Sequence, residues 1–468
     1  MEINNGMNIK KNFFILFSVL IIIGSFFIQG TETLSSGAIR TIALAVVFLI
    51  LLITEALPLT IICWSVLGIM PLINIAPGLG AALSGFSNPV VFFILASFGI
   101  AAAFTELPLS KRILVLLLRK FGKNIKSMLL AIMLCILPLT AFVSSVPICA
   151  LFMGIGLRFL ELFEDDAARK KTGRALMIAI PVTCLFGGVA TPVGSTMNLL
   201  AIDLLETYTN KTISFIQWTS VGVPIVLLML PVAWILICKI YKPAEINSQM
   251  IETFIEKLDV PPKMSSKEKK VLVITSLMLV LWIMSSWFSQ INIVVVAILG
   301  ACIMFFPGIR VLEWNSFAKS INFNSFFLVG TVLSLGKIMD INGVSKWIIT
   351  FFPESQMPLP GLIAFTVALV FTILIIMPVA PSVVMLLALP LINLAQSMGY
   401  SPELIIITLA IASGNCYLLP LDTIPLITYS SGYYSMLDMP KSTFLLQIYV
   451  IIVVTSVLFI ASSVFGII

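Results

Sequence analysis

Residues 175–205 read ALMIAIPVTCLFGGVATPVGSTMNLLAIDLL, an apolar segment that the run GGVATPVGSTMN (187–198) interrupts. A second apolar segment, 402–430, is interrupted in the same way by SGNCYLLPLDTIP (413–425). Gly and Pro break helices, and irregular backbone at membrane depth survives only where protein buries it or where it lines a cavity. These stretches therefore predict two discontinuous membrane helices beside an internal cavity.

The composition of the whole chain agrees with a membrane protein. Of its 468 residues, 60% are hydrophobic and only 10% are charged, whereas soluble domains carry about 25% charged residues. The net charge of +6 is assigned to basic cytoplasmic loops and not to nucleic-acid binding. The chain has no histidine and no nucleotide-binding loop, which argues against an enzyme and against ATP-driven transport.

Two further apolar segments, 127–157 and 358–395, are broken near their middles, at 144–147 and 378–382. Basic residues flank the first segment on both sides, so both of its ends should face the cytoplasm. Each arm of this first segment has about 14–17 residues, fewer than the about 20 that a crossing needs. Both segments are therefore predicted to be re-entrant hairpins.

The predicted fold is an all-α polytopic membrane protein, with about eleven transmembrane helices plus two re-entrant hairpins in two inverted repeats. Corresponding stretches close with Ser110-Lys111 inside and Ser345-Lys346 outside, which is why the repeats are predicted to be inverted. The predicted divisions are a first helix, a first repeat, a cytoplasmic linker and a second repeat: residues 1–40, 41–240, 241–270 and 271–468. The expected location is the inner cell membrane, with the N-terminus in the cytoplasm and the C-terminus outside.

Polar residues at the hairpin tips and helix breaks are the candidate site. Half-helix N-termini present positive dipole ends and suit an anion, while hydroxyl, carbonyl and carboxylate oxygens bind Na⁺. The substrate-binding candidates are Ser144, Ser145, Ser195, Thr196, Asn198, Ser382 and Thr423. The ion-binding candidates are Ser144, Gly194, Asn415 and Asp422, with Na⁺ as the only metal considered. The alternative role of all these groups is to satisfy the unwound backbone.

Asp422 is a functional hypothesis in its own right, because a carboxylate inside a membrane break is costly. It could ligate a cation, carry a coupled proton or pair with a substrate ammonium group. Three kinds of protein remain open on these residues. They are a secondary anion transporter, an ion antiporter such as a Na⁺/H⁺ exchanger using Asp422 and Asp203, and a membrane-embedded enzyme or scaffold.

The sequence also resembles the divalent anion/sodium symporter (DASS) family. The resemblance runs in order along nearly the whole chain through ITEALP (53–58), GFSNPVVFFI (85–94), GGVATPVGSTMN (187–198) and SSGYYSMLDMPK (430–441). It implies a homodimer whose transport domain moves like an elevator against a fixed scaffold. It also implies di- or tricarboxylates or sulfate as substrates, with Na⁺ coupling or exchange and no enzymatic cofactor.

The hairpin tips depart from the family pattern, which typically reads Ser-Asn-Thr. Here the tips read Ser144-Ser145-Val146 and Ala380-Pro381-Ser382. The chain is thus identified as a divergent member of the family. Gly194, Ser195 and Thr423 are the positions to which the roles of family residues transfer best.

Overall fold

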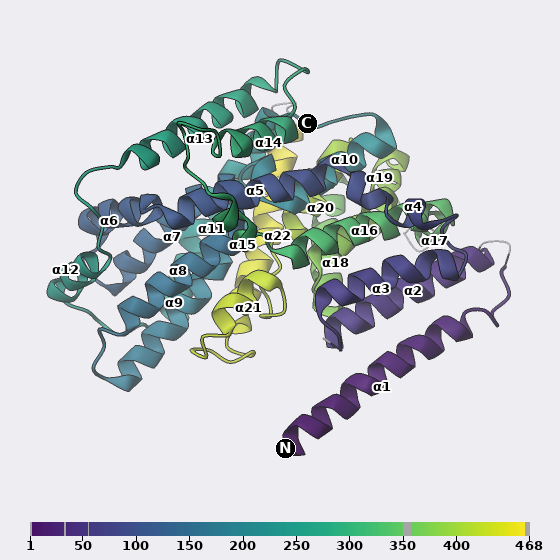
Figure 1. Cartoon of the computed structure of the whole chain (residues 1–468), viewed down its shortest axis with the longest axis horizontal. Coiled ribbons are helices and arrows are strands. Elements are labelled where there is room, and N and C mark those ends of the chain that lie inside the picture. The colour runs from purple at the N-terminus through teal and green to yellow at the C-terminus, as the bar shows by residue number, and fades with distance from the viewer. Residues whose placement is uncertain (1, 32–33, 55, 350–356, 464–468) are drawn as a thin grey trace.

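The computed structural model describes residues 2–31, 34–54, 56–349 and 357–463, and the regular structure within these ranges is entirely helical (Figure 1). Eight of the described helices are long and apolar enough to cross a bilayer, and five shorter apolar helices accompany them. The predicted all-α membrane fold is confirmed. The number of about eleven spans stays a prediction.

The first half of the chain forms the following helices: α1 (Glu2–Gly24), α2 (Ser36–Thr54), α3 (Leu59–Leu72), α4 (Leu79–Ala82), η1 (Ser84–Ser87), α5 (Pro89–Glu106), α6 (Leu109–Phe121), α7 (Ile125–Phe142), α8 (Ser145–Leu160), α9 (Asp166–Gly187), η2 (Pro192–Gly194), α10 (Thr196–Thr209) and α11 (Phe215–Tyr241). Polar caps decide where several of them begin. Asn124 and Ser214 form capping boxes at the starts of α7 and α11, because a side-chain acceptor satisfies N–H groups that the first turn leaves free.

The second half forms α12 (Ser248–Lys257), α13 (Ser266–Met284), α14 (Ile293–Ile303), α15 (Trp314–Ser320), α16 (Phe323–Ile341), α17 (Val344–Ile349), α18 (Leu359–Ile376), α19 (Ala380–Ser397), α20 (Pro402–Ser413), α21 (Thr423–Tyr429) and α22 (Pro440–Ser463). The predicted second repeat extends to residue 468, but 464–468 lie outside the described residues. The first helix is displaced toward the N-terminus relative to the apolar run near 12–29, and α2 already begins inside the predicted first segment. Ser35 explains that early start, since its hydroxyl accepts a hydrogen bond from the Ala38 N–H at 3.1 Å.

The two predicted hairpins are consecutive helix pairs that turn at the predicted breaks. One turn separates α7 from α8 at 143–144, and the other separates α18 from α19 at 377–379. The length argument for re-entry was wrong for one arm of the first hairpin, because α7 has 18 residues and is long and apolar enough to cross. Helices α18 and α19 of the second hairpin also have 18 residues each and are long and apolar enough to cross. Helix α7 begins at Ile125, two residues before the apolar run that starts at 127. Re-entry therefore stays a prediction that rests on the basic flanks.

Helices of each half of the chain pack against helices of the other half. The helix after the first break, α10, packs on α19 and α20, while the helix after the second break, α21, packs on α8 and α9. In the same way α5 packs on α14 and α16 packs on α3, and α11 and α22 pack on each other. The part of each broken helix that follows the break is therefore packed against the opposite half of the chain.

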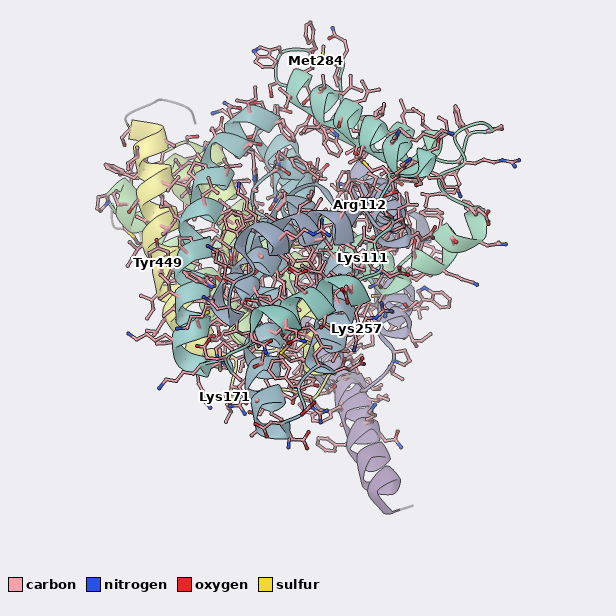
Figure 2. The ribbon with its side chains drawn as sticks, turned by 90° about the vertical axis from the view of Figure 1, so that its left-hand side faces the viewer. Lys111, Arg112, Lys171, Lys257, Met284 and Tyr449 are labelled. Atoms are coloured by element: carbon pink, nitrogen blue, oxygen red, sulfur yellow. The ribbon has the colours of Figure 1, made fainter. Side chains whose placement is uncertain are left out.

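The linker between the halves is docked and partly helical. Arg112 on α6 donates to the buried carboxylate of Glu268 at 2.6 Å and to the Pro261 and Lys263 carbonyl oxygens at 2.6 and 2.7 Å. Helix α12 packs its buried Phe254 ring edge-on against Phe159 of α8, with centroids 5.0 Å apart. Figure 2 views this end of the molecule, where Lys111, Arg112, Lys171 and Lys257 are labelled.

The segment SSGYYSMLDMPK (430–441) contains a loop that Asp438 holds in place. Its carboxylate accepts from the Ser435 backbone and hydroxyl at 2.9 and 2.8 Å and from Lys441 at 2.7 Å, and it pairs with Arg174 of α9 at 3.5 Å. Burial raises the pKa of Asp438, but these donors and charges outweigh burial and lower the pKa to about 2. The loop is thereby fixed to α9 at neutral pH.

Gly85 allows the closest approach between the motif 85–94 and α16. A Cβ atom at Gly85 would lie 2.2 Å from the Gly330 carbonyl oxygen and 2.4 Å from the Ser334 nitrogen. The Gly85 N–H donates to the Ser334 hydroxyl at 2.9 Å. Only glycine fits this contact without displacing backbone.

Replacing Gly85 by Ala should therefore destabilise the protein by about 1–3 kcal/mol, the usual cost of forced overpacking. Gly80→Ala is the matched control, because nothing lies within 4 Å of its would-be Cβ atom. Thermal unfolding of the purified protein in detergent measures both variants. Equal midpoints for the two variants would contradict the close packing at Gly85.

Candidate functional site

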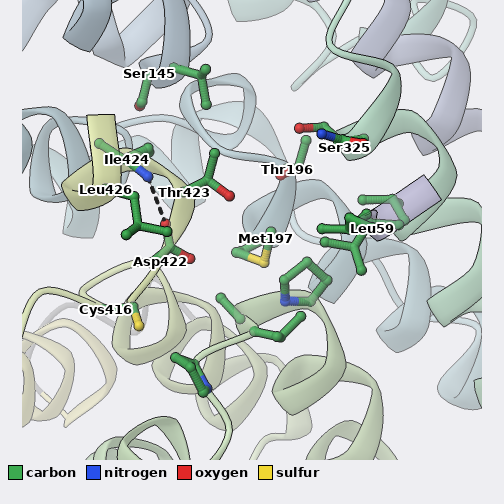
Figure 3. Close-up of a pocket in the computed structure, with 18 of the residues that line it drawn as sticks. Leu59, Ser145, Thr196, Met197, Ser325, Cys416, Asp422, Thr423, Ile424 and Leu426 are labelled. Atoms are coloured by element: carbon green, nitrogen blue, oxygen red, sulfur yellow. Dashed lines mark hydrogen bonds between the residues drawn. The ribbon is translucent and has the colours of Figure 1, made fainter. Parts of the chain in front are cut away.

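A cavity of about 600 Å³ lies where the two hairpin turns meet the two helix breaks (Figure 3). One wall consists of the turns before α8 and α19 and the starts of α10 and α21. The opposite wall consists of the α2–α3 connection, the middle of α5 and the first turns of α16. The cavity thus joins segments that are far apart in the sequence.

Most of the predicted site residues line this cavity. They are Ser144, Ser145, Gly194, Ser195, Thr196, Asp422 and Thr423. Figure 3 shows Thr423 and Thr196 reaching toward the open space between Ser145, Ser325 and Leu59. Asn198, Asn415 and Ser382 are not among the lining residues. They lie behind the surface of the cavity, where Asn198 and Asn415 are fully buried.

The first break is held together by side chains that bind its backbone. Asn198 donates from Nδ2 to the Gly188 and Thr191 carbonyl oxygens at 2.9 and 2.8 Å. Trp218 of α11 donates to the Val189 carbonyl oxygen at 2.9 Å. These bonds satisfy carbonyl groups that the interrupted helix leaves free. Asn198 is thus a partner of the backbone and not a cavity-facing substrate ligand.

Gly194 lies where carbonyl oxygens gather between the break and the first hairpin. A Cβ atom there would lie 2.5 Å from the Gly188 oxygen and 3.0 Å from both the Thr140 and Ala141 oxygens. The Thr191 hydroxyl also donates to the Ala141 carbonyl oxygen, and Ser145 donates to the Cys184 carbonyl oxygen at 3.0 Å. This region is rich in oxygen atoms of the kind that hard cations bind.

The second break begins α21 with Asp422. Its Oδ1 accepts a hydrogen bond from the Ile424 N–H at 3.2 Å (Figure 3), as an N-cap does. Asn415 uses Nδ2 to donate to the Ile411 carbonyl oxygen at 2.6 Å. The buried oxygens of Asn415, Ser413 and Ser382 have no hydrogen-bond partner among the described residues, and the same holds for Asn198 Oδ1 in the first half.

Several cavity residues were missed by the sequence analysis. Ser97 comes from α5, Asn324 and Ser325 come from α16, and Lys11 comes from α1. Asn324 and Ser325 stand in the polar stretch Phe-Asn-Ser (323–325) at the start of an apolar run, a signal that the sequence analysis did not use. No signal in the sequence pointed to Lys11, because only tertiary packing places α1 beside the cavity.

The charges on the described cavity lining are one lysine and one carboxylate. Lys11 is the basic residue and Asp422 the acidic one. Val146 and Pro381, which replace the usual polar residues of the hairpin tips, also line the cavity. Val146 has an apolar side chain with no hydrogen-bonding group, and Pro381 has no backbone N–H. The lining is therefore mainly hydroxyl and apolar groups around few charges.

The architecture matches that of known membrane transporters. A solved structure of MtrF from Neisseria gonorrhoeae, described as illuminating a class of antimetabolite efflux pumps, superposes with a TM-score of 0.57 over 96% of this chain and 94% of that chain at 12% identity. At this identity the likeness concerns the fold alone. The curated relatives include sodium-dependent dicarboxylate transporters named SdcS.

One of these relatives is from Staphylococcus saprophyticus and is 23% identical over 99% of this chain and 94% of its own length. Another is from Staphylococcus aureus strain MRSA252 and is 24% identical over 89% of this chain and 84% of its own length. Both helix breaks lie at one cavity, and the relatives that match along most of the chain are transporters. The chain is therefore a multi-pass membrane transporter and not an enzyme.

The family model for the sodium:sulfate symporter transmembrane region matches residues 9–467. The chain belongs to this family, and the predicted DASS membership is confirmed.

Some site residues bind the backbone of the break, and others face the cavity. Substitutions in these two groups should differ in their effect on thermal stability. Asn198→Ala leaves two carbonyl groups unsatisfied and should cost about 1–3 kcal/mol for each buried group that stays without a partner. Thr196→Ala, in which a cavity-facing hydroxyl is removed, should leave the thermal midpoint near that of the parent protein. A larger loss of stability in Thr196→Ala than in Asn198→Ala would contradict this assignment.

Proposed function

We propose that the protein is a secondary active transporter of a small anion, either a di- or tricarboxylate or a sulfate-like oxyanion. Transport is coupled to Na⁺ or proceeds by exchange, and the cavity of about 600 Å³ is the binding site. This volume lies within the about 300–1,000 Å³ of ordinary ligand pockets. It has room for a small dianion together with coupling ions or water.

The observation that carries the proposal is the convergence of helix N-termini on one cavity. Helices α8, α10 and α19, of 16, 14 and 18 residues, begin at the cavity. Each N-terminus presents the positive end of a helix dipole. The hydroxyl groups of Ser195, Thr196 and Thr423 stand beside them. Together they form a preorganised environment for an anion that needs no cluster of basic residues.

Buried oxygens near both breaks support a coupling cation. The oxygens of Asn198, Asn415, Ser413 and Ser382 have no partner among the described residues, and an unpartnered buried oxygen is costly. Na⁺ would satisfy such oxygens, and its charge would offset that of a bound dianion. The sodium-dependent relatives support the same assignment.

The proposed mechanism is an elevator motion of one cavity wall against the other. The exchange of packing partners between the halves supports an inverted repeat. The hairpins and broken helices would form the moving wall, and α2, α3, α5 and α16 the fixed one. Oligomerisation as a homodimer and residence in the inner cell membrane follow the family resemblance. The basic end in Figure 2 supports a cytoplasmic location for the linker.

A second candidate function is ion antiport, and Asp422 is the observation that favours it. A carboxylate in the cavity wall repels a dianion unless a cation or proton stands between them. An antiporter would instead use Asp422 as the cation carrier and would need no anion.

Uptake into proteoliposomes tests the proposal. Labelled succinate, citrate and sulfate are offered with an inward Na⁺ gradient, with choline in place of Na⁺, and with unlabelled anion inside the vesicles. We expect accumulation of at least one anion that either collapses without Na⁺ or requires internal anion. Proton or Na⁺ flux without uptake of any anion would instead support the antiporter.

Asp422→Asn tests the role of the carboxylate in the transport cycle. If the carboxylate helps bind the coupling cation, its neutralisation should raise the Na⁺ concentration for half-maximal uptake by about tenfold, equivalent to about 1.4 kcal/mol. Glu206→Gln is the control, since this exposed carboxylate on α10 lies outside the cavity lining. Unchanged Na⁺ and pH dependence in Asp422→Asn would remove Asp422 from the coupling step.

A further inference from the structure

We propose that a polar latch holds α10 against α5 and α16 at the end of these helices away from the cavity, and that transport requires this latch to open. The polar latch consists of Asn88, Asp203, Tyr208 and Asp340. None of the four lines the cavity, so the latch is separate from the proposed binding site. The inference rests on the proposed function in one respect: alternating access requires one cavity wall to move relative to the other, which breaks the contacts between them.

The first contact of the polar latch joins α10 to α5. Asn88 donates from Nδ2 to the Asp203 carboxylate at 2.7 Å. Its Oδ1 accepts from the Val90 N–H at 2.8 Å, because Asn88 is also the N-cap of α5. The amide nitrogen and the amide oxygen of Asn88 are therefore both hydrogen-bonded, which fixes the orientation of the side chain. Asp203 thus binds α10 to the start of α5.

The second contact joins α10 to α16. The Tyr208 hydroxyl donates to the Asp340 carboxylate. Lys337, one turn earlier on α16, donates to the Ser84 carbonyl oxygen at 3.4 Å, and its charge acts on Asp203. Both contacts of the latch are hydrogen bonds to carboxylates, which are stronger than bonds between neutral groups.

The helices that the latch joins are the ones that form the opposing walls of the cavity. Helix α10 contributes Ser195 to Met197 from its start, α5 contributes Ser97, and α16 contributes Ser325. Asp203 follows Thr196 by seven residues, or about 10 Å of helix, and Asp340 follows Ser325 by fifteen residues, or about 22 Å. The cavity lies near the beginning of α16, and the latch lies near its end.

The surroundings of the latch are closely packed on the same side. Gly85 and Ser334 bring η1 into backbone contact with α16 just before Asn88. Figure 1 shows α4 and α17 at this end of the molecule, opposite α6 and α12. The latch therefore closes the end opposite the docked linker. A conformation with the cavity open to that end would have to exchange both latch contacts for water.

Distances between spin labels test the latch without any substrate. Labels are placed at Thr207→Cys on α10 and Ile341→Cys on α16, two exposed positions, in a Cys302→Ser background. Cys302 is the exposed native cysteine, and the other six are buried. Pulsed electron resonance on the full-length protein in liposomes then reports the distribution of separations between the two helices.

Asp203→Ala and Tyr208→Phe each remove one latch contact. The population with separated helices should rise about tenfold in each, as expected for loss of a hydrogen bond to a charged group. Glu206→Ala is the matched control, because Glu206 is an exposed carboxylate on the same helix outside the latch. Its distribution should equal that of the parent protein.

Unchanged distributions in Asp203→Ala and Tyr208→Phe would overturn the proposal, and so would a shift of the same size in Glu206→Ala. Size-exclusion chromatography shows whether each variant folds. If Asp203→Ala does not fold, Tyr208→Phe alone tests the latch, because this variant keeps the aromatic ring and loses only the hydroxyl group. The labels report helix separation and not transport. A protein that fails the uptake test can therefore still pass or fail this one.

Discussion

The structure depends on one constraint, which is that a helix interrupted inside an apolar environment must still satisfy its backbone polar groups. At the first break the constraint is met by Asn198 and Trp218, which donate to carbonyl oxygens of the interrupted helix. At the second, Asp422 caps the helix that resumes. The opposite half of the chain packs on the helix that follows each break. The two halves are thereby held together at the same place where the cavity forms.

The same constraint explains how the cavity can suit an anion with so few basic residues. Every interruption produces a new helix N-terminus, and the N-termini of α8, α10 and α19 all face one space. The helix dipoles at those positions are fixed by the fold and are not removed by single side-chain changes. The altered hairpin tips, with Val146 and Pro381 on the lining, are compatible with this view. They reduce side-chain recognition while the dipoles of the half-helices remain.

Much of the fold could be predicted from the sequence, because apolar runs and their Gly- and Pro-containing breaks depend on local chemistry. The turns at 143–144 and 377–379 lie where the breaks were expected. Arm lengths could not be predicted in this way, since helix continues past the apolar run into residues such as Ile125 to Ser127. For the site, the positions of Ser195, Thr196 and Thr423 followed from the breaks. Asn198 was assigned to substrate by residue type, but its buried bonds depend on backbone geometry that no spacing reveals. Lys11 and Ser97 reach the cavity only through tertiary packing.

Thermal stabilisation by ligands tests the central claim most directly, because a ligand that binds only the folded state raises its stability with the logarithm of the ligand concentration once that concentration exceeds the dissociation constant. The purified protein is heated with succinate, citrate, sulfate or chloride, each in Na⁺ and in choline. We predict that at least one divalent or trivalent anion raises the melting temperature and that Na⁺ increases the effect of that anion. Identical melting curves for all anions, with or without Na⁺, would contradict an anion site between the half-helices.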